Sequence, residues 1–151
     1  MTLEELNNDI LLSLKGEQWK LIKDFENYAI SNYGRVFNLK AGRFKQFSAN
    51  TFFAYGKRRV ASRKYLSVQL HYKDKTAHRC VHKLVAEAFV ENDDLEHKTV
   101  VDHIDNDPKN NMASNLRWAT PAFNTSVAKN DELQKYNRWL LEKLNGVSQN
   151  D

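Results

Sequence analysis

Cysteine is almost absent from this 151-residue chain, in which Cys80 is the only thiol. One thiol cannot form an intramolecular disulfide, and it cannot build a zinc site that needs several thiolate ligands. The sequence therefore excludes zinc-finger and zinc-ribbon proteins, and we expect no zinc in its functional site.

Long apolar runs are absent as well, because no stretch approaches the roughly 18 consecutive apolar residues of a membrane span. The first residues, MTLEELNNDILLSLK, carry acidic side chains where a secretory signal has a basic and then apolar profile. We therefore expect a cytoplasmic protein with no membrane partner.

The composition is that of an ordinary globular protein, with 41% hydrophobic and 28% charged residues. The length suits one well-packed domain, or a core domain with a small appendage. Net charge is only +4, but residues 56–83 hold nine basic side chains against Asp74 alone, a local charge of +8. The nine are Lys57, Arg58, Arg59, Arg63, Lys64, Lys73, Lys75, Arg79 and Lys83. Charge alone fits a polyanion-binding face and a solvated sheet surface equally well.

The first half of the chain alternates between one helical segment and several short β runs. Leu3, Leu6, Ile10 and Leu14 have roughly helical spacing and predict an amphipathic helix that packs on the body or forms a dimer contact. Strands are predicted over residues 19–22, 28–31 and 35–38, and the aromatic-rich residues 43–55 should continue this sheet. Residues 56–59 are predicted to form a basic loop.

The second half is predicted to contain a hairpin, a helix and then a second hairpin followed by helices. Residues 65–72 alternate in polarity as a half-buried strand does, and a second strand is expected over residues 76–79. The next apolar residues follow helical spacing: Val81, Leu84, Val85, Ala88 and Phe89.

Residues 99–129 carry the chemistry. A predicted strand runs into Asp102 and His103, a polar loop follows over residues 105–111, and a short strand resumes over residues 115–118. Thr120 is suited to cap a helix that begins at Pro121 and bears Asn124. A last amphipathic helix is predicted over residues 132–144.

This order brings a carboxylate, an imidazole and an amide carbonyl within reach of one another. Asp102 and Asn124 offer hard oxygen ligands that suit Mg²⁺ or Mn²⁺ better than zinc. His103 alternates to the other side of the strand, where a neutral imidazole can act as a general base toward water. An isolated Asp-His pair at a strand end is more often merely polar surface.

Two further interpretations of this segment, a calcium-binding loop and a glycosylation site, are not supported by the sequence. A calcium loop would need an oxygen ligand at Lys109, and it would need a central glycine and a closing glutamate that are missing. Asn124 begins a glycosylation acceptor, which means little in a chain without a secretion signal.

The whole string VVDHIDNDPKNNMASNLRWATPAFNTS, residues 100–126, resembles the HNH or ββα-metal nuclease motif of phage and intron-encoded homing endonucleases. The resemblance implies that Asp102 binds the metal, that His103 is the general base and that Asn124 is a metal ligand. It also implies that Asn115 pins the loop that positions the histidine. Many relatives have glycine where this chain has Asn106, and asparagine tolerates the left-handed φ that such a loop needs.

The string EQWKLIKDFENYAISNYGRVFNLK, residues 17–40, resembles the DNA-binding module that often precedes this nuclease domain. The residues that carry this second resemblance are Trp19, Phe25, Tyr28, Ser31, Asn32 and Gly34. VHKLVAEAFV, residues 81–90, is similar to the helix that family members carry just before the motif.

Together these features predict an α+β fold: an antiparallel N-terminal sheet, then a ββα-metal motif and a C-terminal helix. The expected divisions are an amphipathic helix (1–16), a β-rich DNA-binding module (17–64), the nuclease domain (65–129) and a helix with a tail (130–151).

The predicted function is metal-dependent hydrolysis of DNA phosphodiester bonds, nicking or site-preferring, with 5′-phosphate and 3′-hydroxyl products implied by the resemblance. The alternative is a non-catalytic DNA-binding or interaction protein that retains a vestigial HNH fold. The expected partner is double-stranded DNA, and the expected oligomeric state is a monomer or a homodimer. The expected location is the cytoplasm, which is that of a bacterial host cell if the chain is phage-encoded. The predicted DNA contacts are Lys57, Arg58, Arg59, Arg63, Lys64, Arg79 and Arg117.

Overall fold

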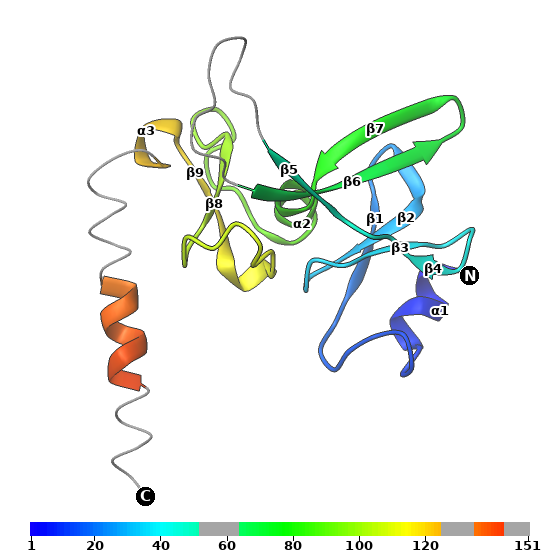
Figure 1. The fold of residues 1–151 in the computed structure, drawn as a ribbon, viewed down its shortest axis with the longest axis horizontal. Helices are drawn as coiled ribbons and strands as arrows, with labels where there is room; N and C mark the ends of the chain where they lie inside the picture. The colour runs from blue at the N-terminus through cyan, green and yellow to red at the C-terminus, as the bar shows by residue number, and fades with distance from the viewer. Residues whose placement is uncertain (52–63, 125–134, 144–151) are drawn as a thin grey trace, which may run out of the picture.

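The protein is described by a computed structural model that covers residues 1–51, 64–124 and 135–143. It has the predicted α+β fold, in which an N-terminal antiparallel sheet is followed by a second sheet, a central helix and a β-hairpin with a helical turn (Figure 1). Among the residues described, no helix is both long and apolar enough to cross a membrane.

The N-terminal sheet has four antiparallel strands in chain order. They are β1 (Trp19–Ile22), β2 (Phe25–Ser31), β3 (Val36–Asn38) and β4 (Arg43–Phe44). A tight turn joins β2 to β3, with Gly34 at φ +83°. Aromatic residues fill one side of this sheet, where Trp19, Phe37 and Phe44 meet with ring centroids 5.0–6.3 Å apart.

The first helix is much shorter than predicted. It comprises α1 (Leu3–Asn8), with Thr2 as its N-cap, and only Leu6 is fully buried. The side chain of Asp9 accepts hydrogen bonds from the backbone of Leu11 and Leu12, so the chain turns instead of continuing the helix. Ile10 is consequently 91% exposed, although its spacing predicted an inward position.

The second sheet joins strands that the sequence analysis placed in different modules. It consists of β5 (Ser48–Thr51), β6 (Lys64–Tyr72) and β7 (Lys75–Cys80) in that order. Residues 43–55 were expected to continue the first sheet, and β4 does so, but β5 pairs with β6 instead. The division expected between residues 64 and 65 thus falls within β6.

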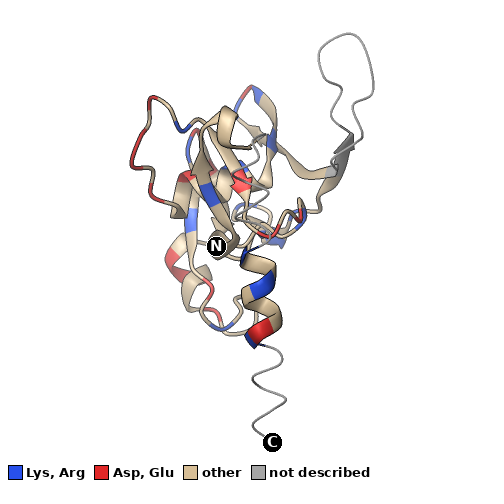
Figure 2. Cartoon of the chain, turned by 90° about the vertical axis from the view of Figure 1, so that its left-hand side faces the viewer, with Lys and Arg blue, Asp and Glu red and all other residues tan. Residues whose placement is uncertain are grey.

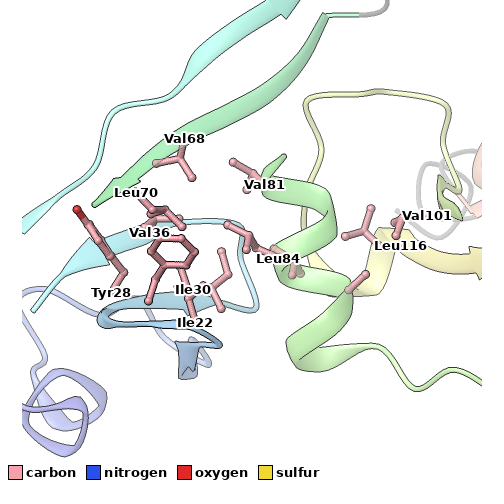
Figure 3. Packing of buried hydrophobic residues seen from close by; sticks show 13 residues of the cluster. Ile22, Tyr28, Ile30, Val36, Val68, Leu70, Val81, Leu84, Val101 and Leu116 are labelled. Atoms are coloured by element: carbon pink, nitrogen blue, oxygen red, sulfur yellow. The ribbon is translucent and has the colours of Figure 1, made fainter. Parts of the chain in front are cut away.

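The helix α2 (Val81–Phe89) is the centre of the hydrophobic core. One side of α2 meets residues of the first two sheets, among them Ile30, Val36 and Leu70, and the other side meets Val101 and Leu116 of the last hairpin (Figure 3). The periodicity of residues 81–89 predicted this helix and its apolar face correctly. One cluster of buried side chains therefore connects the N-terminal sheet with the hairpin that carries the chemistry.

The last hairpin consists of β8 (Val100–His103) and β9 (Leu116–Ala119), with the short 3₁₀ helix η1 (Ala113–Asn115) just before β9. The turn α3 (Pro121–Asn124) follows at once, and Thr120 caps it as predicted by accepting a hydrogen bond from the backbone of Phe123 at 3.1 Å.

Residues 135–143 form a further helix with no buried side chain. Trp139 is 50% exposed and stacks on Tyr136 at 6.1 Å between ring centroids.

Candidate active site

Asp102 and His103 end strand β8, and Asn124 ends the helical turn α3. All three side chains line one small hollow of about 170 Å³, together with Tyr65, Val101, Asn106 and Pro108. Thr120 and Pro121 make this possible, because they start a helix directly after β9 and turn Asn124 back toward β8. The structure thus brings together three of the four residues that the sequence analysis assigned to the chemistry.

Asp102 is buried, with 1% of its surface exposed. In the register of the hairpin it lies opposite Arg117, whose Nε donates a hydrogen bond to Asp102 Oδ2 at 2.9 Å. The guanidinium also lies over the ring of Phe123 in α3, 4.9 Å from its centroid. A buried carboxylate requires a compensating charge, and Arg117 supplies one inside the site.

His103 is also buried, with 6% of its surface exposed, and its Nε2 lies 2.8 Å from Asn111 Oδ1. Its ring is one of three that gather beside the hollow. His103 stacks on Tyr65 at 6.0 Å between centroids, and His82 of α2 lies 5.1 Å from His103 and 5.0 Å from Tyr65. Aromatic neighbours of this kind fix the plane of the imidazole by packing.

His82 is held in its neutral form. Burial, followed by electrostatic repulsion with His103 and with Lys83, lowers the pKa of His82 to about 3. The helix α2 therefore presents an uncharged ring to His103, which adds packing without adding a second charge to the site.

Asn115 lies in η1, immediately before β9, and its side chain is hydrogen-bonded within the polar loop. Its Nδ2 donates to Asp105 Oδ1 at 2.9 Å and to the Asn110 carbonyl at 2.8 Å, while its Oδ1 accepts from the Asp105 backbone at 3.1 Å. Asn106 adopts the left-handed conformation expected of it, with φ +62°.

Asp105 is the charged residue at the centre of this loop. Burial by itself raises the pKa of Asp105, but hydrogen bonds from Asn110, the Asp107 backbone and Asn115 outweigh burial and hold that pKa below its usual value. Asp105 is therefore a charged acceptor around which the loop closes.

Hard oxygen donors are available for a divalent cation in this hollow. Asp102 provides a buried carboxylate and Asn124 an amide oxygen, and both line the same space as the imidazole of His103. Two protein oxygens suit Mg²⁺ or Mn²⁺, which bind few protein ligands and accept water and phosphate oxygens for the remainder. The residues present fit such an ion.

The predicted DNA-binding residues are placed only in part. Lys57, Arg58, Arg59 and Arg63 lie outside the described residues, and for Lys64 only the backbone in β6 is described. Figure 2 shows basic and acidic residues intermixed on the described elements. Arg79 is exposed on β7 and lines a different, larger hollow of about 840 Å³ between the first sheet and α2.

Asn111, Tyr65 and His82 belong to the site but were missed in the sequence. Asn111 lies in a run of polar turn residues, where an amide usually serves the backbone. Tyr65 is separated from His103 by 38 positions, and only the packing of both β6 and β8 against α2 brings the two together.

Known proteins resemble both halves of the chain. Residues 17–71 match the NUMOD4 motif and residues 79–125 match the family model of the HNH endonucleases. The uncharacterized HNH endonuclease L247 of Acanthamoeba polyphaga mimivirus is 38% identical over 125 residues, which cover 81% of this chain and 28% of that protein. The DNA endonuclease I-HmuI of Bacillus phage SP01 is 34% identical over 108 residues, which cover 71% of this chain and 55% of that protein.

The fold is also similar to a solved structure. That structure concerns DNA binding and cleavage by the HNH homing endonuclease I-HmuI, and it matches with a TM-score of 0.58 at 28% identity, covering 80% of this chain and 68% of that chain. The chain spans about half the length of the phage relative and less than a third of the mimivirus relative. Sequence and structure agree that the chain belongs to the HNH endonuclease family, with a NUMOD4 motif ahead of its HNH region.

Proposed function

We propose that this chain is a DNA endonuclease that hydrolyses phosphodiester bonds with the help of one divalent ion, Mg²⁺ or Mn²⁺. The observation that carries the proposal is the shared hollow, in which Asp102, His103 and Asn124 meet at the junction of β8 and α3. A carboxylate, an imidazole and an amide oxygen at one point are the groups that hydrolysis of a phosphate diester needs.

In this proposal His103 acts on the attacking water. Its ring is fixed by the packing of Tyr65 and His82 and by the hydrogen bond to Asn111. One ring nitrogen can therefore face the hollow without a loss of rotational freedom during the reaction. That nitrogen takes the proton of the water as the oxygen attacks phosphorus in line with the departing 3′ oxygen. Asn115 holds the loop on which this geometry depends, and it does not touch the reacting atoms.

Asp102 and Asn124 would hold the divalent ion. A bound ion supplies positive charge that stabilises the phosphorane and the departing oxygen. Arg117, hydrogen-bonded to Asp102, adds a permanent cation at the edge of the hollow, where a phosphate oxygen of the DNA would lie.

Basic side chains elsewhere would hold the DNA backbone. Arg79 and the basic residues of segment 57–64 are proposed contacts, and binding through phosphates predicts an affinity that falls steeply with salt concentration. One such site in the chain predicts that a monomer nicks one strand, whereas a homodimer could cut both.

The test is plasmid relaxation with Mg²⁺, Mn²⁺ or EDTA, in wild type and in His103→Ala, with His97→Ala as the control. His97 is exposed on another loop, where its side chain pairs with Asp94, so its removal should leave cutting unchanged. We expect open circular product with either metal, none with EDTA, and a loss of about 10²- to 10⁴-fold in His103→Ala.

Two outcomes would contradict the proposal. If His103→Ala cuts as fast as wild type in the presence of metal, His103 is not the base. If no metal supports cutting while gel shifts show binding to the same plasmid, the chain is a DNA-binding protein that retains the fold without the activity.

A further inference from the structure

Within residues 1–51, 64–124 and 135–143, one side chain is hydrogen-bonded to Nε2 of His103, and it is that of Asn111. The atoms Nε2 and Asn111 Oδ1 are 2.8 Å apart, and both residues are buried, with 6% and 4% of their surfaces exposed. A carbonyl oxygen only accepts hydrogen bonds, so Nε2 must carry the proton. In the neutral ring the lone pair then lies on Nδ1, which leaves that atom as the one able to take a proton from water.

The side chain of Asn111 lowers the stability of the fold. Its Nδ2 is buried and finds no hydrogen-bond partner among the described residues. An unsatisfied buried amide destabilises a fold by about 1–3 kcal/mol, and an apolar side chain at the same place would avoid this loss. In the part of the chain that the structure describes, the Asn111 side chain makes one hydrogen bond, to His103, so its polarity serves the imidazole and not the fold.

The N-terminal sheet supports Asn111 from behind. Gly34, in the turn between β2 and β3, is so close that a Cβ atom added to it would lie 3.1 Å from both Cβ and the carbonyl oxygen of Asn111. In the same turn the Asn32 carbonyl accepts a hydrogen bond from the backbone of Ala113 at 2.8 Å. Asn32 is itself held by the backbone N–H of Gln18, which donates to Asn32 Oδ1 at 2.8 Å.

We propose that Asn111 is the positioning residue that fixes the tautomer of His103, and that the Asn32–Gly34 turn of the N-terminal sheet holds Asn111 in place. The NUMOD4 region would then support the reaction as well as bind DNA. The proposal rests on the function proposed above, because it assigns Nδ1 of His103 as the atom that accepts the proton from water.

A neutral amide is suited to this task. It orients the ring by a hydrogen bond but adds no negative charge, so it does not favour the imidazolium form. A carboxylate in the same position would keep the orientation and would stabilise the protonated ring, which makes Asn111→Asp an informative variant.

The first test is ¹⁵N NMR of the full-length chain labelled at histidine, with the His103 signals identified by their absence in His103→Gln. We expect wild-type His103 as the Nε2–H tautomer at neutral pH, a mixture of tautomers in Asn111→Ala, and the Nε2–H tautomer kept in Asn111→Asp, whose carboxylate can still accept from Nε2. This readout needs no cleavage, so it remains valid even if His103→Ala shows that His103 is not the base.

The second test is plasmid cleavage with Mn²⁺ as a function of pH. Asn111→Ala should lose about 10- to 100-fold in rate, less than removal of the base itself. Asn111→Asp keeps an acceptor for the Nε2 proton of His103 and should lose less of the rate than Asn111→Ala. Circular dichroism and thermal melts establish that each variant is folded.

Gly34→Ala and Gly42→Ala form a matched pair for the supporting turn. Both glycines have positive φ, +83° and +71°, so both substitutions strain the backbone similarly, but a Cβ at Gly42 meets nothing within 4 Å. We expect Gly34→Ala to disturb the His103 signals and slow cutting, and Gly42→Ala to do neither. The proposal is overturned if His103 keeps one tautomer in Asn111→Ala, or if the two glycine variants behave alike.

Discussion

His82 makes the stability of this protein dependent on pH in a range where its carboxylates contribute little. The ring lies on α2 with 6% of its surface exposed, against Tyr65 and His103 and next to Lys83 in sequence, and its Nδ1 is buried without a hydrogen-bond partner among the described residues. Burial, followed by electrostatic repulsion with His103 and with Lys83, lowers its pKa from 6.5 to about 3. Unfolding restores the ordinary value.

The direction of the effect follows from counting protons. Between these two pKa values the unfolded chain binds a proton at His82 and the folded chain does not, so the free energy of unfolding falls as the pH falls. Each pH unit in this window is worth about 1.4 kcal/mol. From pH 7 to pH 5 the loss should therefore be about 2 kcal/mol, most of it below pH 6.5.

His82→Leu tests this magnitude, because it keeps an apolar side chain in place and removes the titrating group. Urea unfolding followed by tryptophan fluorescence at pH 7, 6 and 5 gives the slope for each protein. Wild type should lose about 2 kcal/mol more than His82→Leu over this range. His78→Leu is the control, since His78 is exposed on β7, and it should keep the wild-type slope.

Glu17 and Asp105 contribute little to the change in unfolding free energy between pH 7 and pH 5. The pKa of each carboxyl is held below its usual value by hydrogen bonds that outweigh burial. The stability that they contribute is present above pH 5 and is lost only as the pH falls further, through their lowered pKa values. Equal slopes for wild type and His82→Leu would refute the reasoning, because they would mean that His82 titrates alike in the folded and unfolded chain.

Three further predictions concern the loop, the core and the ion pair. Asn115→Ala should slow plasmid cutting about 10- to 100-fold by releasing the loop around Asp105, with the thermal melt still cooperative; an unchanged rate would exclude a role for the loop. Leu84→Ala should lower the free energy of unfolding in urea by about 2–5 kcal/mol, and a change below about 1 kcal/mol would place α2 outside the core. Arg35→Met should destabilise the fold by about 3 kcal/mol at pH 7, because it leaves the buried carboxylate of Glu17 without its partner. The deficit of this last variant against wild type should shrink below pH 4 as Glu17 becomes protonated, and a constant deficit would point to lost packing instead.

The sequence predicted those parts of the structure that local rules determine. The periodicity of residues 81–89, the alternation in residues 65–72 and the Thr120-Pro121 helix start all appear in the structure as expected. Asp102, His103 and Asn124 meet because β8 and β9 pair as an antiparallel hairpin and α3 begins directly after β9.

The features that the sequence did not predict arise where local signals compete or where residues far apart in the sequence come into contact. Helical spacing through Ile10 and Leu14 was overridden by Asp9, whose side chain bonds to the backbone and turns the chain. No local pattern could show that β5 would pair with β6, because residues 48–51 suit either sheet. The contacts of Asn111 with His103 and Gly34 join segments whose approach only the complete fold determines.

The central position of α2 limits how this protein can be divided and recombined. Its two sides are covered by the N-terminal sheet and by the β8–β9 hairpin, so neither half retains a closed core without the other (Figure 3). A fragment that begins at residue 65 would expose the apolar face of α2 and should aggregate. An engineer who wishes to attach a new targeting domain should therefore transplant residues 17–124 as one piece, and evolution would be under the same constraint when it exchanges such modules.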